Sequence, residues 1–245
     1  MTLSAELQHA HRVRGLIDEL LGDPRQLGPD YQPIVRLADG LVVAYKATGR
    51  GRPGTELADT LSLLAQAQSL GLVERIDWAF RALAFEDCLT AGDLELHLTP
   101  EPETFATLCP PRHAALFARA RRDLRVAAEV HADAFADAAR LQRGLDEIRG
   151  WGWRVVLADL ADEAAGATAI ASVSPDIVQV DLSSPGRCAV APSAAVEAWV
   201  DAARGAGAEL MALGVDSPAA RATATALGAT TARGALLGSP GPLPR

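Results

Sequence analysis

Six polar side chains stand near the carboxyl ends of six segments that have the composition of β-strands. An ammonium, an imidazole and four carboxylates are groups that exchange protons or hold charged ligands. Because the active sites of α/β barrels lie at the carboxyl ends of the strands, these residues are the first candidates for function. They are Lys46, His97, Glu129, Asp159, Asp181 and Asp216.

The elements that must position these residues follow a repeated pattern. From residue 31 onward, short runs rich in β-branched and apolar residues alternate with longer runs of helical periodicity, which is typical of βα units around a buried sheet. Helical segments are predicted at 56–70, 73–89, 135–149 and 193–206. Eight strands are predicted, at 31–37, 41–47, 94–99, 124–132, 153–160, 176–183, 209–215 and 230–237.

The first two predicted strands are separated only by Ala38, Asp39 and Gly40. A turn of this length makes a hairpin, because a parallel pair needs a crossover of a dozen residues or more. One strand of the barrel is therefore predicted to be antiparallel. Residues 1–30 carry an amphipathic helix that ends near Gly22, and we expect them to form a helical flank of a single barrel domain at 31–245.

Composition narrows the class of partners. The net charge of −8 and the aromatic content of 4% argue against a nucleic-acid-binding surface. No segment has the length of a membrane span or the pattern of a signal peptide, and the three cysteines show no paired spacing. We expect a cytoplasmic protein with free thiols that binds neither nucleic acid nor membranes.

Motifs at the strand ends resemble those of the EAL family, the cyclic-di-GMP phosphodiesterases, from residue 31 to residue 240. The opening Tyr31-Gln32-Pro33-Ile34-Val35 resembles the YQPIV motif of the family, and seven further motifs follow in order. They begin at Lys46, His97, Glu129, Ala158, Gln179, Ala212 and Arg233. The resemblance implies a modified TIM (β/α)8-type barrel with one antiparallel strand.

Within these motifs the residues of the family's chemistry are largely replaced. The signature glutamate is Lys46, and the metal-binding asparagine is His97. The first aspartate of the Asp-Asp pair is Ala158, the lysine beside the attacking water is Gln179, and the glutamate of the Glu-Gly motif is Leu213. The resemblance therefore implies a degenerate site with no expected catalytic residues.

Only Glu129 and Asp159 survive among the metal ligands that the resemblance implies. Two carboxylates make a weak cage for Mg²⁺, which prefers several oxygen ligands in octahedral geometry. Lys46 would oppose a second cation, so we expect an ion pair where the family binds metal, and no cofactor. His97 is interpreted as a packed histidine, with a replacement metal ligand as the alternative.

Ligand binding is a separate question from catalysis. Gln32, Arg50 and Pro240 match family positions that contact the dinucleotide, and Asp181 and Arg233 are further candidates. Two hypotheses follow. The first is a non-catalytic signalling domain that binds a protein partner or serves as a cyclic-di-GMP receptor. The second is a phosphodiesterase with residual Mg²⁺- or Mn²⁺-dependent hydrolysis to pGpG. A homodimer is plausible by resemblance, through the N-terminal helix or the helix at 57–70.

Overall fold

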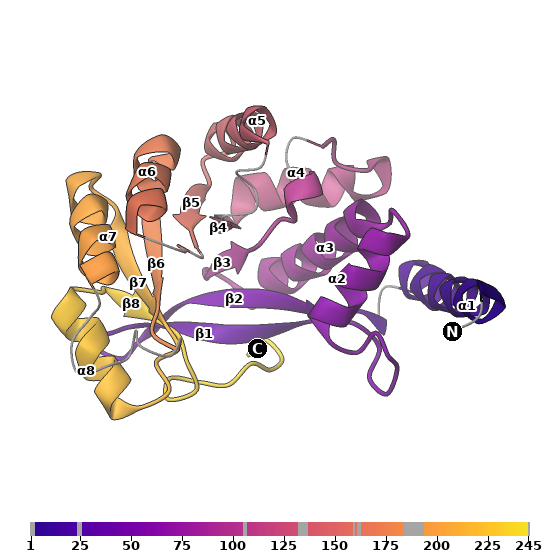
Figure 1. Ribbon diagram of the computed structural model, residues 1–245, viewed down its shortest axis with the longest axis horizontal. Helices are drawn as coiled ribbons and strands as arrows, with labels where there is room; N and C mark the ends of the chain where they lie inside the picture. The colour runs from indigo at the N-terminus through magenta and orange to yellow at the C-terminus, as the bar shows by residue number, and fades with distance from the viewer. Residues whose placement is uncertain are drawn as a thin grey trace.

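The computed structural model describes residues 3–23, 26–104, 107–131, 137–158, 160, 163–183 and 194–244. In this part of the chain the strands close into a barrel in sequence order, from β1 to β8 (Figure 1). The strands are β1 (Gly28–Arg36), β2 (Val42–Arg50), β3 (Glu95–Leu98), β4 (Arg125–Val130), β5 (Arg154–Leu157), β6 (Ile177–Asp181), β7 (Glu209–Leu213) and β8 (Thr231–Ala232).

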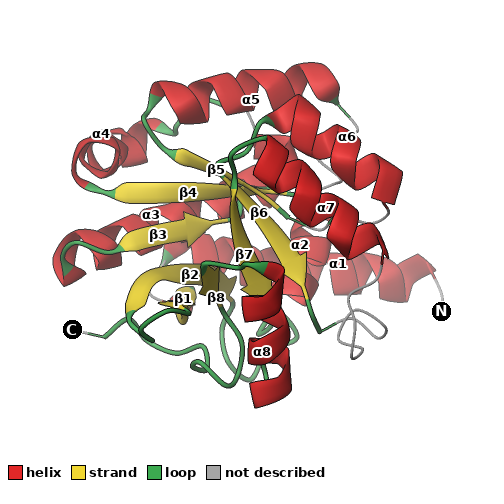
Figure 2. Cartoon of the chain, turned by 90° about the vertical axis from the view of Figure 1, so that its left-hand side faces the viewer, coloured by secondary structure: helices red, strands yellow, loops and turns green. Residues whose placement is uncertain are grey.

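Helices cover the outside of the barrel, and Figure 2 shows α4 to α8 arranged around the strands. The α-helices are α1 (Leu3–Gly22), α2 (Thr60–Ser69), α3 (Val73–Ala91), α4 (Ala114–Asp123), α5 (Ala138–Gly150), α6 (Glu163–Val173), α7 (Ala194–Gly205) and α8 (Pro218–Leu227). Two 3-10 turns, η2 (Pro102–Thr104) and η3 (Pro111–His113), connect β3 to α4. None of the described helices is long and apolar enough to cross a bilayer.

The antiparallel strand predicted from the Asp-Gly turn is β1. It pairs antiparallel with β2 and also with β8, whereas every neighbouring pair from β2 to β8 is parallel. Gly40 has a φ of 77°, a left-handed conformation that favours glycine in a tight turn. The predicted fold class is confirmed, and the reversed strand follows from the length of one turn.

Some element boundaries differ from the prediction for local reasons. The helix expected from residue 56 begins at Thr60, because Asp59 caps it by accepting a hydrogen bond from the Ser62 amide at 2.9 Å. The last strand is only two residues long. Helices α4, α6 and α8 were not predicted, and α6 and α8 are dominated by small residues that give little helical periodicity.

One apolar cluster packs the N-terminal helix against α2 and α3, and another fills the interior of the barrel. Val13, Ile17 and Leu20 of α1 are buried against α2 and α3, so α1 packs onto one side of the barrel (Figure 1). Inside the barrel, six residues from six strands form a separate apolar layer. They are Ile34, Ala44, Ala127, Val156, Ile177 and Met211.

Candidate functional site

A layer of mostly polar side chains lies one step above the apolar layer of the barrel interior. Because side chains two residues apart on a strand point to the same face, each apolar residue has a partner nearer the barrel mouth. These partners are Gln32, Lys46, Glu129, Ala158, Gln179 and Leu213. His97 stands opposite Lys46 in the parallel register of β2 and β3. The fold thus brings three of the predicted strand-end residues together, Lys46, His97 and Glu129.

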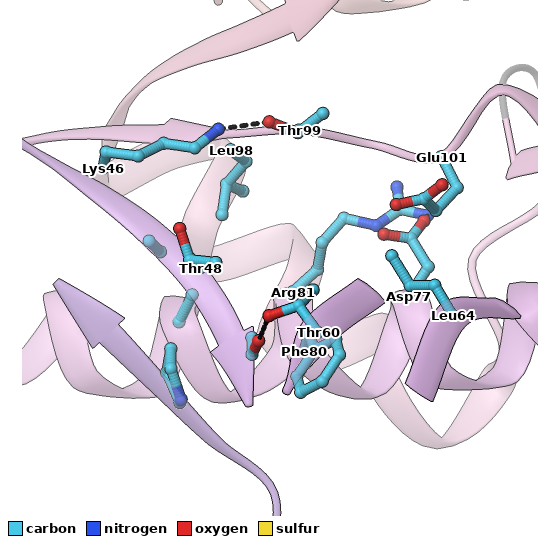
Figure 3. Close-up of a pocket in the computed structure, with 14 residues that line it drawn as sticks. Lys46, Thr48, Thr60, Leu64, Asp77, Phe80, Arg81, Leu98, Thr99 and Glu101 are labelled. Atoms are coloured by element: carbon cyan, nitrogen blue, oxygen red, sulfur yellow. Dashed lines mark hydrogen bonds and ion pairs between the residues drawn. The ribbon is translucent and has the colours of Figure 1, made fainter. Parts of the chain in front are cut away.

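The centre of this layer is a buried ion pair between β2 and β4. Lys46 Nζ lies 2.5 Å from Glu129 Oε2, and the two residues are 6% and 1% exposed. Lys46 also donates a hydrogen bond to Thr99 Oγ1 (Figure 3). Thr99 in turn donates to Glu129 Oε2 at 3.2 Å. The ion pair expected from the sequence is confirmed.

The second oxygen of Glu129 is occupied as well. Gln179 Nε2 donates a hydrogen bond to Glu129 Oε1 at 2.8 Å. His97 is 2% exposed, with Nδ1 at 3.5 Å from the same oxygen and Nε2 at 3.8 Å from Glu95 Oε1, both longer than usual hydrogen bonds. His97 is therefore packed beside the carboxylate, and protein groups surround both oxygens of Glu129.

Burial and charge shift the pKa values of this pair. Burial alone would raise the pKa of Glu129, but the Lys46 ammonium, His97 and the Arg233 charge outweigh it and hold that pKa well below its usual range. Burial lowers the pKa of Lys46, and the Glu129 carboxylate offsets only part of that shift. We infer an ionised pair at neutral pH, because hydrogen bonds from Gln179 and Thr99 also favour the carboxylate.

Arg233 reaches the same layer from the end of β8. Its Nη1 donates a hydrogen bond to Gln32 Oε1 at 3.1 Å, and Gln32 Nε2 donates to the Gly238 carbonyl at 3.2 Å. Pro240 is exposed in the tail that follows, just before Gly241, whose backbone pairs with Tyr31. Gln32, Arg233 and the segment around Pro240 thus form one side of the barrel mouth.

The remaining candidates lie apart from the central pair. Arg50 is half exposed and pairs with Asp30 at 2.5 Å, so its charge is already compensated. Asp181 accepts hydrogen bonds from the amide and hydroxyl of Ser183, and Asp216 accepts one from the Ala235 amide. These two aspartates stabilise loops at the barrel mouth.

Of the two surviving metal-ligand positions that the sequence suggested, the structure describes only Glu129. Asp159 lies outside the described residues. Among the residues that the structure does describe, no three His, Cys, Asp or Glu side chains gather as a metal site. Ala158 and Leu213 contribute only apolar surface at two of the strand ends.

A small cavity of about 190 Å³ opens beside Lys46, between the ends of β2 and β3 and helices α2 and α3 (Figure 3). Its polar lining includes Lys46, Thr99 and Glu101, together with the buried pair Asp77 and Arg81. The backbone at Gly49 approaches α3 so closely that an added Cβ would lie 2.5 Å from the ring of Phe80. Glycine at this position is therefore required by packing.

Three features of the site were missed in the sequence. Thr99 lies two residues after His97, so strand alternation could have placed it on the same face. Asp77 and Arg81 have the i,i+4 spacing of a helical ion pair. Lys46 is the only lysine of the chain, and the other 22 of its 23 basic residues are arginines. A lone lysine at a strand end was therefore a signal of a special role.

A closed eight-stranded barrel with a reversed first strand and a polar layer at the parallel strand ends defines a modified TIM-type barrel. Residues 17–240 match the EAL domain family, so the chain belongs to this family. A search among curated proteins finds no match to the sequence.

Solved structures with the same fold include the FimX EAL domain of Xanthomonas citri in complex with c-di-GMP. It is 18% identical, with a TM-score of 0.80 over 98% of this chain and 97% of that one. The phosphodiesterase PaMucR, in a c-di-GMP complex, is 24% identical, with a TM-score of 0.77 over 96% and 98%. The Bacillus subtilis YkuI protein, with c-di-GMP and calcium, is 20% identical, with a TM-score of 0.72 over 93% and 59%.

Proposed function

We propose that this chain is a non-catalytic EAL domain that binds cyclic-di-GMP without a divalent metal. The observation that carries the proposal is the buried ion pair between Lys46 and Glu129. An ammonium at 2.5 Å from the carboxylate occupies the space and the charge that a metal ion would need. The protein's own cation replaces the metal.

The described residues do not fit a divalent metal. Mg²⁺ binds several oxygen ligands at once and keeps near-octahedral geometry. Here Glu129 is held by Lys46, Thr99 and Gln179, and a metal ion would have to displace these donors. Metal-assisted hydrolysis polarises the phosphate and acidifies a bound water, so a site that excludes the metal loses that chemistry.

Binding of the dinucleotide requires less than hydrolysis does. FimX, PaMucR and YkuI were solved in complex with c-di-GMP, and their fold is that of this chain. The mouth of this barrel presents Arg233, whose positive charge complements a phosphate of such a ligand. These features support a receptor that keeps the ligand intact.

Calorimetry with cyclic-di-GMP, in EDTA and again in Mg²⁺, tests this function. We expect the same affinity in both buffers and no linear pGpG when the mixtures are analysed by chromatography. The Lys46→Glu variant is expected to remain inactive as well, because Ala158 and Gln179 are unchanged. Accumulation of pGpG by the unmodified chain would overturn the non-catalytic proposal, and an absence of heat in both buffers would overturn the receptor.

A protein contact is the second candidate, favoured by one observation. Leu61 on α2 is 81% exposed, although it belongs to a helix whose Leu63 and Ala67 are buried. We propose that the protein partner at this face is a second copy of the chain. Light scattering of the unmodified chain should then give a dimer mass, and Leu61→Asp should give a monomer mass. Equal masses for the two proteins would refute this contact.

A further inference from the structure

Arg233 is held in place by its backbone but has an incomplete set of side-chain partners. Its amide donates to the Ala212 carbonyl at 2.9 Å, and its carbonyl accepts from the Val215 amide at 3.2 Å. Both bonds fix it at the end of β7. Its side chain donates to Gln32 Oε1, yet its buried Nε has no hydrogen-bond partner among the described residues. A guanidinium in this state lacks an acceptor.

The charge of Arg233 acts on the centre of the site. It contributes to lowering the pKa of both Lys46 and Glu129, which places the guanidinium within electrostatic reach of the ion pair. Within the described part of the chain, its side-chain partner is a neutral amide, whereas Lys46, Arg50 and Arg81 each face a carboxylate. Of these four cations, Arg233 is therefore the one whose charge no carboxylate of the described residues compensates.

We propose that Arg233 binds a phosphate oxygen of the ligand directly. An arginine presents its donors as a planar fork that fits a phosphate, and an anionic acceptor would satisfy the Nε–H that Gln32 leaves unpaired. Gln32 acts as a positioning residue, because it holds Nη1 and is itself held by the Gly238 carbonyl. The identity of the ligand as cyclic-di-GMP rests on the proposed function, whereas the anion site does not.

Calorimetry in EDTA with three variants tests this assignment. Arg233→Gln removes the charge and is expected to weaken cyclic-di-GMP binding by about 10- to 100-fold. Arg233→Lys keeps the charge but loses the fork, and an intermediate loss is expected. Arg125→Gln is the matched control, because Arg125 pairs with Asp93 at the opposite end of β4. It should bind like the unmodified chain.

A second measurement separates the anion site from the identity of the ligand. Inorganic pyrophosphate should raise the melting temperature of the unmodified chain and of Arg125→Gln, but not that of Arg233→Gln. If cyclic-di-GMP fails to bind while this stabilisation remains, cyclic-di-GMP is refuted as the ligand and the Arg233 anion site is supported. If cyclic-di-GMP binds Arg233→Gln as tightly as it binds the unmodified chain, the Arg233 site is refuted and the receptor function is supported. No response to either compound refutes both.

Discussion

Two buried ion pairs lie on either side of the small cavity, and they differ in how they are built. Lys46 and Glu129 join strands β2 and β4 across 83 residues of sequence, whereas Asp77 and Arg81 are one turn apart on α3. The N–O distance is 2.5 Å in both pairs. The first pair depends on closure of the barrel, and the second needs only a helix.

The two carboxylates have opposite pKa shifts although both are buried. For Asp77, burial raises the pKa, and Arg81 together with Thr104 does not overcome it. For Glu129, burial has the same sign, but the nearby cations outweigh it and the pKa falls well below the usual range. The comparison shows that burial alone does not set protonation. The charges and donors around each carboxylate decide it.

Removing the cation from each pair should give the largest effects. Lys46→Met leaves Glu129 buried and charged, and we expect a loss of about 3–5 kcal/mol in the free energy of unfolding. Arg81→Met should lose less, about 1–3 kcal/mol, because Asp77 already has a raised pKa and takes up a proton more readily. Urea denaturation at neutral pH measures both losses.

A double variant provides the control for this comparison. In Lys46→Met/Glu129→Gln no charge is left unpaired, so much of the lost stability should return. Equal losses for Lys46→Met and Arg81→Met would show that the two carboxylates are held in the same way, contrary to their pKa shifts.

The pH dependence of stability should distinguish the pairs by sign. Glu129 has a lowered pKa in the folded state, so its contribution is present above the unfolded value near 4.5 and is lost as pH falls below it. Asp77 has a raised pKa, so its contribution is present below 3.8 and is lost as pH rises through the folded value. The two carboxylates therefore tilt the stability curve in opposite directions.

Unfolding measured from neutral pH into the acid range checks this expectation. Glu129→Gln should make stability rise less steeply with pH than in the unmodified chain, and Asp77→Asn should make it rise more steeply. Changes of the same sign in both variants would contradict the contrast between the two sites.

The sequence predicted the barrel well because its strands and its first turn carry strong local signals. The three-residue turn at Asp39 and Gly40 was enough to predict the reversed strand. Helices such as α6 were missed, because an alternation of alanine, glycine and threonine has no clear apolar face. Strand existence was therefore more predictable than the helices between the later strands.

The site could be predicted in position but not in its bonding. Motif positions placed Lys46 and Glu129 at the ends of two strands on either side of β3, and their ion pair followed from charge. The bond between Gln32 and Arg233 joins residues 201 positions apart, and it depends on how the C-terminal tail closes against β1. No local pattern carries that information, since it arises only when the barrel closes.

The smallest expected effect concerns the charge state of Lys46 itself. Because Lys46 is the only lysine in the chain, protein labelled with [13Cε]lysine should give a single lysine side-chain resonance in NMR. Its titration should report a pKa below 10.5, since burial outweighs the attraction of Glu129. Arg233→Gln should raise this pKa slightly, because a nearby positive charge is removed, whereas Arg81→Gln near the other pair should leave it closer to the unmodified value. A pKa at or above 10.5 would mean that Glu129 compensates fully for the burial of Lys46, and the metal-excluding cation would then be held more tightly than the comparison of the two pairs implies.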